Sequence, residues 1–396
     1  MTTSFLRAAL ILGLLSAIGP FAIDMYLPAL PAIGTTLGAS TSAVQGSLMA
    51  FFIALGVGQI IYGPVSDQIG RKPPLYFGLA LFAVGSVGCA LAPDIHTLVT
   101  MRFVQGLGAR AGSVVPRAVV RDLYTGHQAL RLMSMLMLVF SVSPILAPLA
   151  GSLLTEALGW RSAFWFMLGA GLLGLVLVAT QLDETRPAAE RAASNWGQAL
   201  RGYATLMRDR HFLGLTFIGA FGIASFFAYL ANSSFVLIEH YGLTPRQYSV
   251  VFASNAASFI GMSQLTARLG KRFGLKPMVR AAAHGYAGVM VSLLALFLAG
   301  FDALPVLLAL LFVGYGFLGL IIPTSAILAL DDHGPIAGTA SALMGTLQFA
   351  TGAVVMAITG LFVDGTGTPM VAAIAGSAAM TWLLVRVTLA SVKQKH

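Results

Sequence analysis

The sequence predicts an all-α polytopic membrane protein with twelve transmembrane helices arranged as two six-helix halves. Hydrophobic residues make up 57% of its 396 positions and charged residues only 9%, and the mean hydropathy is +0.86. Soluble domains carry about 25% charged residues, so this chain has too little polar surface to cover a soluble core. Twelve apolar runs and one long polar stretch at mid-chain set the number of spans and their division into halves.

Each apolar run is close to the roughly 20 residues that an α-helix needs to cross a bilayer. The runs cover residues 8–30, 44–62, 75–92, 97–119, 133–154, 161–180, 211–237, 247–267, 278–299, 304–329, 337–362 and 370–390. The first run follows Arg7 as a signal peptide would, but it is longer than the apolar region of a signal peptide and no small-residue cleavage site follows it. We therefore expect it to remain as a transmembrane helix.

Positive charges gather in the segments that would lie on one side of the membrane. The net charge is +9, and most basic residues fall in alternate short loops rather than on one domain, which argues against a nucleic-acid surface. Because cytoplasmic loops carry an excess of lysine and arginine, both termini are expected in the cytoplasm. The single cysteine, Cys89, excludes an intramolecular disulfide and a cysteine metal cluster.

The longest polar stretch, 181–210, lies at mid-chain. It predicts an N-terminal six-helix bundle over 1–180, a cytoplasmic linker over 181–210 and a C-terminal six-helix bundle over 211–396. A weakly amphipathic segment near 196–207 predicts a linker helix on the inner membrane surface.

The turn between the second and third runs is a short segment dense in special residues. It carries, at fixed offsets, Gly63, Asp67, Gly70, Arg71 and Lys72. Gly63 is expected to let a neighbouring helix approach closely, and Asp67 to face an arginine or the positive end of a helix. An ordinary tight loop with cytoplasmic charges would explain Arg71 and Lys72 but not the glycines and the acid. A degenerate copy follows two hundred residues later at 270–272, with Ala267 in place of the acid.

One acid, Asp24, lies well inside an apolar run, where a carboxylate costs about 3 kcal/mol on insertion scales. Such a group normally faces a protein interior or a water-filled path, and a buried carboxyl binds a proton more tightly than an exposed one. We interpret Asp24 as a proton-binding carboxylate. The alternative is an acid near the outer end of its helix, solvated or capping the next loop.

Arginines lie inside the fourth run. Arg102 is a few residues from its outer end, at a depth like that of Asp24, and Gln105 follows one turn later. Arg102 is expected to face the protein interior; the alternative is a side chain that reaches back to the outer interface. Arg110 lies eight residues deeper than Arg102, about 12 Å along the helix, and suggests an additional cation or a preference in substrate charge.

Small residues and proline mark the fifth run. They are Ser143, Ala147, Pro148, Ala150 and Gly151. This spacing favours close helix packing, and a proline bends a helix. A generic packing face is the alternative.

The second half offers aromatic and amide side chains that could contact a flat, weakly polar ligand. They are Phe226, Phe227, Tyr229, Asn232, Asn255 and Tyr315. Each of them could equally pack against helices or lipid. Two histidines, His284 and His333, have no partner at the spacing of metal ligands, so no metal site is predicted.

The loop pattern Gly-x-x-x-Asp-x-x-Gly-Arg-Lys resembles that between helices 2 and 3 of the major facilitator superfamily. The resemblance implies two six-helix halves around a central cavity and a conformational latch formed by Gly63, Asp67, Gly70, Arg71 and Lys72, with Asp122 as the partner at the foot of helix 4. The phrase Arg102-Phe103-Val104-Gln105-Gly106-Leu107-Gly108 resembles the helix 4 motif of that superfamily, whose arginine takes part in proton coupling or substrate binding. The fifth run resembles its antiporter motif, which packs helices 5 and 8 and prevents proton leak.

Over both halves the chain is similar to the bicyclomycin-resistance (Bcr/CflA) branch of drug:proton antiporters. The segments 23–31, 121–122, 183–187 and 337–341 carry this resemblance. It implies proton-driven export of bicyclomycin-, phenicol- or sulfonamide-type drugs across the bacterial inner membrane by alternating access.

The interpretation is therefore a transporter with Asp24 as the proton site and Arg102 as its coupled cation. The expected substrate contacts are Asp24, Tyr26, Arg102, Gln105, Arg110, Phe226, Tyr229, Asn232, Asn255 and Tyr315. Its partners would be a small-molecule substrate, protons and the lipid bilayer, and not nucleic acid. The protein would work as a monomer. It would need no cofactor, because the proton gradient would supply the energy. A proton-coupled importer of a metabolite remains an alternative. A receptor or a membrane-embedded enzyme is another, but one buried acid with arginines supplies no paired catalytic groups.

Overall fold

The computed structural model describes residues 5–193 and 196–390, and within these ranges every regular element is helical. The elements are α1 (Phe5–Asp24), η1 (Leu27–Ala29), α2 (Leu30–Leu37), α3 (Thr41–Ile69), α4 (Lys72–Ala90), α5 (Ile95–Leu123), α6 (Gly126–Leu158), α7 (Arg161–Gln181), α8 (Ala188–Ala193), α9 (Trp196–Leu206), α10 (Arg210–Ser234), η2 (Phe235–His240), α11 (Pro245–Phe273), α12 (Leu275–Leu298), α13 (Leu304–Asp331), η3 (Gly334–Ile336), α14 (Ala337–Gly360) and α15 (Thr368–Ala390).

In the described part of the chain, 10 helical segments are long and apolar enough to cross a membrane. The two remaining long helices, α5 and α11, have 29 residues each and coincide with the fourth and eighth predicted spans. They fall short on composition, not on length, because α5 carries four arginines and the middle of α11 carries several serines, asparagine and glutamine. With these two helices included, the predicted all-helical architecture is confirmed.

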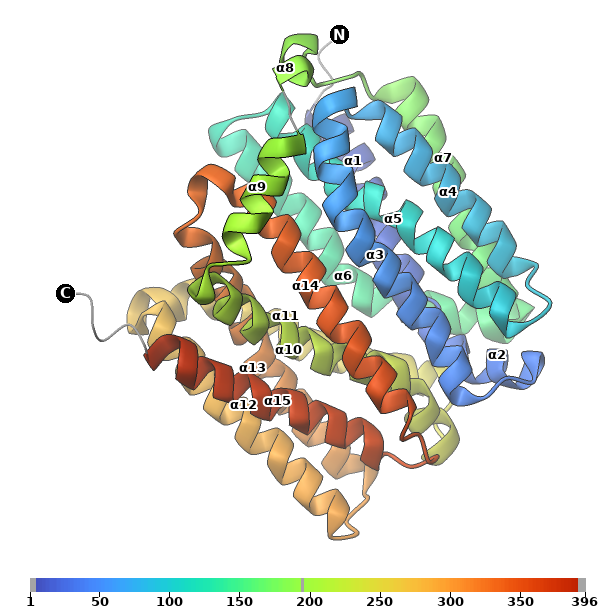
Figure 1. Cartoon of the computed structure of the whole chain (residues 1–396). Helices are drawn as coiled ribbons and strands as arrows, with labels where there is room; N and C mark the ends of the chain where they lie inside the picture. Colours follow the sequence, from blue (N-terminus) through green and yellow to red (C-terminus); the bar gives the residue numbers. More distant parts are fainter. Residues whose placement is uncertain (1–4, 194–195, 391–396) are drawn as a thin grey trace. The chain divides into compact units, whose positions relative to one another are not determined.

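The chain divides into two compact units, Met1–Ala199 and Leu200–His396 (unit 1 and unit 2). In unit 1, α5 contacts both α3 and α4, and α7 packs on α4 (Figure 1). Helix α1 contacts α5, α6 and α7, so it is enclosed within this bundle. The boundary between the units falls inside the polar stretch 181–210, where the chain forms the short helices α8 and α9.

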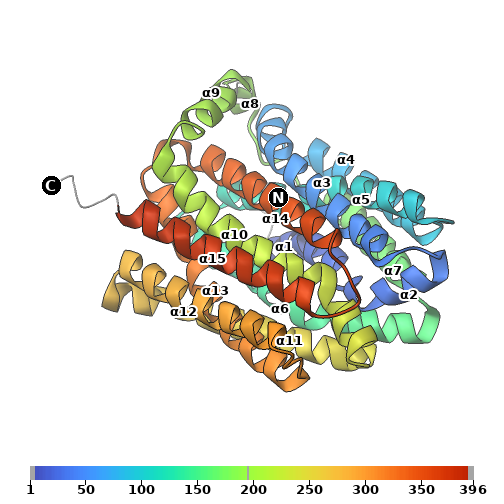
Figure 2. The same ribbon diagram turned by 60° about the horizontal axis from the view of Figure 1, so that its bottom comes forward.

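Unit 2 is built from the six long helices α10 to α15. Helix α10 contacts α13, α14 and α15, and α15 lies between α10 and α12 (Figure 2). Helix α11 packs on α13, which also contacts α12. In unit 1 α5 contacts α1, α3, α4 and α6, and in unit 2 α13 contacts α10, α11, α12 and α14, so these two helices touch the most other long helices of their units.

The first predicted span, 8–30, is interrupted in the structure. Helix α1 ends at Asp24, a 3-10 turn follows at Leu27–Ala29, and α2 continues from Leu30. Pro28 and Pro31 sit in the first positions of these two later elements, where a missing backbone N–H costs nothing. Because a proline cannot donate to the preceding turn, the helix breaks beside Asp24. The predicted span is confirmed as one membrane-crossing segment, Phe5–Leu37, and the structure adds the interruption after Asp24.

Candidate functional site

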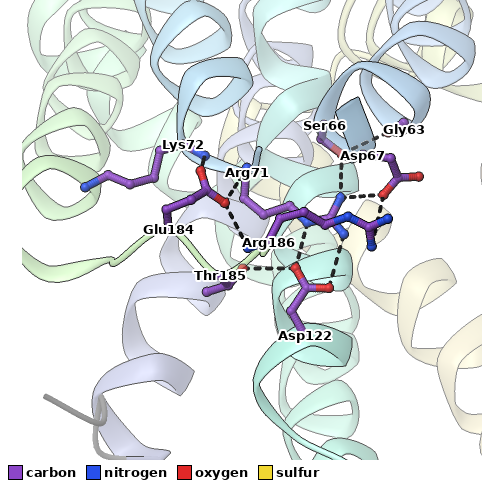
Figure 3. Close-up of polar contacts among 9 residues, drawn as sticks. All are labelled: Gly63, Ser66, Asp67, Arg71, Lys72, Asp122, Glu184, Thr185 and Arg186. Carbon is purple, nitrogen blue, oxygen red and sulfur yellow. Dashed lines mark hydrogen bonds and ion pairs between the residues drawn. The ribbon is translucent and has the colours of Figure 1, made fainter. Parts of the chain in front are cut away.

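A network of ion pairs surrounds Arg71 at the turn between α3 and α4 (Figure 3). The Arg71 guanidinium is only 2% exposed and donates from Nη1 to Asp67 Oδ1 at 2.7 Å and to Ser66 Oγ at 2.9 Å. Its Nε and Nη2 donate to the two oxygens of Asp122, at 2.7 and 3.1 Å. The structure therefore joins the loop residues Asp67 and Arg71 to Asp122 at the end of α5, the partner predicted from the sequence.

The segment after α7 is part of this network, which the sequence analysis missed. Thr185 Oγ1 donates to Asp122 Oδ2 at 3.0 Å, and Arg186 Nη1 lies 3.9 Å from Asp67 Oδ1. We call the set Ser66, Asp67, Arg71, Asp122, Glu184, Thr185 and Arg186 the latch network. It ties the ends of α3 and α5 to the start of the linker, all within unit 1.

Glu184 binds the N-terminus of α4. Its carboxylate accepts the backbone N–H of Arg71 at 2.8 Å and of Lys72 at 3.0 Å, the free donors that begin every helix. Gly70, with φ of +101°, turns the chain into this position, and a Cβ there would collide with the Glu184 carboxylate. The glycine is required both for its backbone conformation and for the space that Glu184 occupies.

Two pKa shifts show how strongly the latch network favours its charged forms. Partial burial alone would raise the pKa of Glu184, but the N–H donors of Arg71, Arg186 and Lys72 outweigh it and lower the pKa. Burial likewise would lower the pKa of Arg71, and the hydrogen bonds and charges of Asp122 and Asp67 raise it instead. Both groups are fully ionised at neutral pH.

Gly63 does not have the role that was expected. Among the described residues, nothing lies within 4 Å of where its Cβ would be, so no neighbouring helix makes close contact there. Its carbonyl accepts a hydrogen bond from Ser66 Oγ at 2.9 Å, which connects it to the latch network. The ammonium of Lys72 points away from the acids and lies 5.8 Å from the centre of the Tyr76 ring.

Asp24 is the last residue of α1 and is 5% exposed. Over residues 5–193 and 196–390 its carboxylate makes no hydrogen bond and no ion pair. An ionised carboxylate in this position would be a buried, uncompensated charge, whereas a protonated one would not. Helix α1 ends at Asp24 and a 3-10 turn follows at Leu27–Ala29, so the carboxyl lies where the regular helix is interrupted.

Arg102 is fully buried between aromatic rings of unit 1. Its guanidinium carbon lies 4.5 Å from the Tyr26 ring centre and 4.1 Å from that of Phe51. Nη1 donates to Gln105 Oε1 at 2.6 Å and to the carbonyl of Ala22 at 3.2 Å. Among the described residues no contact joins Arg102 to Asp24, but the Ala22 carbonyl that it binds is two residues before Asp24.

Tyr26 and Gln105 complete this buried group. The Tyr26 hydroxyl is hydrogen-bonded to Ser47 Oγ at 2.6 Å, and Gln105 Nε2 donates to Ser86 Oγ at 2.8 Å. Tyr26, Arg102 and Gln105 are all 0% exposed, so the predicted substrate contacts at these residues would require the unit to rearrange. Arg110, in contrast, is half-buried, and its side chain packs so close to Gly58 of α3 that a Cβ there would collide with it.

The fifth-run motif lies on α6. Ser143, Ala147, Pro148 and Gly151 are buried, while Ala150 is half-buried. A Cβ at Gly151 would collide with the backbone carbonyl of Met25, so the glycine lets α6 approach the break that follows Asp24. The packing of this motif against the eighth predicted span, 247–267, remains a prediction.

An aromatic cluster forms in unit 2. Tyr229 stacks on Phe252 with ring centres 5.8 Å apart and contacts Tyr315 at 5.4 Å, while Phe226 lies 5.9 Å from Tyr315. Asn255 Nδ2 donates to the Tyr229 hydroxyl at 3.0 Å. Four predicted residues thus come together, and Phe252, three positions before Asn255, is the member that the sequence analysis missed.

The other predicted members lie elsewhere or differ in exposure. Asn232 donates to the Ala228 carbonyl of its own helix at 2.8 Å, and the ring of Phe227 is tilted against that of Phe349, with centres 5.6 Å apart. Within the cluster only Phe226 is half-exposed, and the buried Tyr315 hydroxyl has no hydrogen-bond partner in the described structure.

The two histidines are held by other residues. His333 Nε2 lies 3.1 Å from Asp209 Oδ2, at the start of α10, and His284 Nδ1 lies 2.7 Å from the Arg280 carbonyl. In residues 5–193 and 196–390 no group of three or more His, Cys, Asp and Glu side chains could hold a metal ion.

Helices of membrane-spanning length in two units, with ion pairs at one loop and a buried carboxyl where α1 is interrupted, are features of multi-pass membrane transporters. The family model described as Major Facilitator Superfamily matches residues 12–357. The chain belongs to this superfamily.

Similar proteins extend over nearly the whole chain. The uncharacterized MFS-type transporter YdgK of Bacillus subtilis (strain 168) is 36% identical over 92% of this chain and 91% of its own length. The bicyclomycin resistance protein homolog of Haemophilus influenzae is 31% identical over 91% of this chain and 90% of its own. A crystal structure of a D-xylose-proton symporter has the same fold, with a TM-score of 0.74 and 17% identity over 98% of this chain and 97% of its own.

Proposed function

We propose that the protein exports small drug-like molecules from the bacterial cytoplasm in exchange for protons, by alternating access. The observation that carries this proposal is Asp24, a nearly buried carboxyl without a hydrogen bond or charge partner in the described structure, at the point where α1 unwinds. The similarity to a bicyclomycin resistance protein homolog supports a drug as the substrate.

Proton coupling would use the short path between Asp24 and Arg102. Arg102 is held by the Ala22 carbonyl, on the same helix as Asp24. A movement of α1 that brings the guanidinium to the carboxylate would favour the ionised acid and release the proton, and the reverse movement would favour reloading. Gly151 has no side chain, so α6 lies close to the backbone of Met25, beside the part of α1 that would move.

The latch network would fix one of the two states. Its ion pairs lie at the turn between α3 and α4, where the basic residues predict the cytoplasmic side. The same charge bias supports cytoplasmic termini and the bacterial inner membrane as the location, and the protein would work as a monomer.

The direction of transport is tested in cells that express the protein. A panel of bicyclomycin, chloramphenicol and a sulfonamide identifies compounds whose toxicity the protein reduces, and accumulation of each hit is then measured with and without a proton uncoupler. Higher accumulation after uncoupling is expected for an exporter. Lower accumulation would support a proton-coupled importer, and no effect with any compound would remove drug export from the proposal.

A further inference from the structure

The second end of the linker is fastened to unit 2, at the turn between α13 and α14. Gly202 of α9 packs on the first turn of α14, where a Cβ at Gly202 would lie 3.0 Å from Thr339 Cγ2. Asp209, the residue before α10, places its Oδ2 3.1 Å from His333 Nε2. All four residues belong to unit 2, so the linker has an attachment there that is separate from the latch network of unit 1.

Both ring nitrogens of His333 face oxygen atoms that accept hydrogen bonds. Nδ1 lies 3.1 Å from the carbonyl of Ala329, four residues earlier in α13, while Nε2 faces the Asp209 carboxylate. A neutral imidazole has a single N–H and leaves the lone pair of its other nitrogen against an oxygen, whereas a protonated imidazole donates from both nitrogens. Both contacts are therefore hydrogen bonds only while His333 is protonated.

Asp209 is the fixed charge of this pair. Its Oδ1 accepts the backbone N–H of His211 at 2.8 Å and of Phe212 at 3.0 Å, and so caps α10. Partial burial alone would raise the pKa of Asp209, but these two N–H groups and the charge of His333 outweigh it and lower the pKa. Asp209 is therefore ionised at neutral pH, and histidine is the side chain that changes its charge in that range.

Asp209 is the charged group that contacts His333 among residues 5–193 and 196–390. The Phe212 ring of α10 lies edge-on to the imidazole, with ring centres 5.2 Å apart. The side chains of His333 and Asp209 are 13% and 35% exposed, so solvent protons reach the pair. The other ionisable groups in the adjoining segments make no ion pair in the described structure; they are Arg208, Arg210, His211, Asp331 and Asp332.

We propose that His333 and Asp209 form a pH-sensitive clasp that holds the end of the linker against the turn between α13 and α14. Protonation of His333 closes the clasp, because both nitrogens then donate and an imidazolium faces a carboxylate. Deprotonation removes one hydrogen bond and the attraction between opposite charges, so α9 leaves α14 more often. The clasp is tightest in acid and weakens as the pH rises through neutrality. This inference does not depend on the proposed substrate or on Asp24.

Trypsin cleavage after Arg208 measures how often the clasp opens, because this exposed arginine must leave the folded linker to enter the protease. The cleavage rate of the purified full-length protein in detergent is measured between about pH 6 and pH 8. At each pH it is divided by the rate for an unfolded peptide of residues 203–213, which removes the pH dependence of trypsin itself. The ratio is expected to rise about fivefold from the acidic to the alkaline end. A ratio that stays constant or falls overturns the inference.

Two substitutions identify the groups responsible. His333→Gln keeps a hydrogen-bond donor but cannot become charged, and Asp209→Asn keeps an acceptor for the cap of α10 but removes the negative charge. In each variant the ratio should change by less than about twofold over the same pH range. The two changes lie in different segments, so the second decides the outcome if the first prevents folding.

His284→Gln is the matched control. Nδ1 of His284 also faces a carbonyl four residues earlier in its own helix, that of Arg280 at 2.7 Å, but in the described structure no carboxylate faces its other nitrogen. This variant should keep the rise of the wild type, and so should His211→Gln, which replaces the histidine nearest to the cleavage site. A rise that survives in His333→Gln, or that disappears in either control, places the sensor elsewhere and overturns the inference.

Discussion

The turn that follows α3 in unit 1 and the turn that follows α11 in unit 2 carry related residues but different structures. In unit 1, α3 ends at Ile69, so Arg71 lies beyond the helix end and is buried among carboxylates. In unit 2, α11 continues to Phe273 and ends at Gly274, so Lys271 and Arg272 stay on its exposed last turn. Among the described residues neither of these two contacts a carboxylate.

This difference separates two uses of basic residues at a membrane surface. In unit 2 the charges complement the negative end of a helix and orient the chain in the bilayer. In unit 1 an acid one turn earlier, at Asp67, and a glycine that ends the helix place the arginine within reach of Asp122. Charge alone therefore specifies topology, and only the added acid and helix break produce the latch network.

The largest effect on stability is expected from replacing Arg71 of unit 1, with Arg272 of unit 2 as the comparison. Arg71→Gln leaves Asp67 and Asp122 without their shared cation and should destabilise the protein by about 3 kcal/mol, the low end for breaking a buried ion pair. Arg272→Gln should change stability by less than about 0.5 kcal/mol, as surface substitutions do. Thermal unfolding of both purified variants measures this; equal losses would contradict the comparison.

A smaller effect is expected from Asp67→Asn, which removes one of the two acids bound to Arg71 while Asp122 remains. The protein should stay folded and bind substrate with unchanged affinity, but transport should slow by about tenfold, because one of the two states loses about 1.4 kcal/mol of its stability. Transport rates in proteoliposomes check this. A wild-type rate would mean that the loop is only a topological turn.

Glu184→Gln should weaken the link between the linker and α4 by about 0.5–1 kcal/mol, since the amide keeps an acceptor but loses the charge at a helix N-terminus. The lowered pKa of Glu184 sets the pH range over which its contribution to stability is lost. Its contribution is fully present above the ordinary value of 4.5 and is lost as the pH falls through the lowered value in the folded protein. Proteolysis of the linker at several pH values measures it, and a loss already between pH 6 and 8 would contradict this assignment.

No loss of stability is expected from a change in the aromatic cluster of unit 2. Tyr315→Phe removes a buried hydroxyl that has no partner in the described structure, so stability should stay the same or rise by about 1 kcal/mol. If this hydroxyl contacts substrate, affinity should fall about fivefold for ligands with a hydrogen-bonding group there and not for those without. A clear loss of stability would show that the hydroxyl is satisfied by an internal partner.

The spans and the loop were predictable because their signals are local. A run of about 20 apolar residues specifies a helix across the bilayer wherever it occurs, and the offsets of Asp67, Gly70 and Arg71 lie within two turns. The break after Asp24 was less evident, since Pro28 and Pro31 follow it inside a run that stays apolar.

The long-range contacts could not be predicted in this way. Glu184 meets Arg71 across 113 residues of sequence, and only the packing of α7 on α4 brings them together. The aromatic environment of Arg102 depends on Tyr26, in the turn after α1, and on Phe51 of α3. A periodicity in one segment carries no information about either of these contacts.

The central claim is that Asp24 carries the transported proton. Its most direct test is the proton release that a compound identified in the export panel induces from the purified protein in weakly buffered detergent. Wild type and Asp183→Asn, which alters an exposed acid of the linker, should release protons equally, whereas Asp24→Asn should release none and still bind the compound. Undiminished release from Asp24→Asn would contradict the account, because it would place the proton site elsewhere.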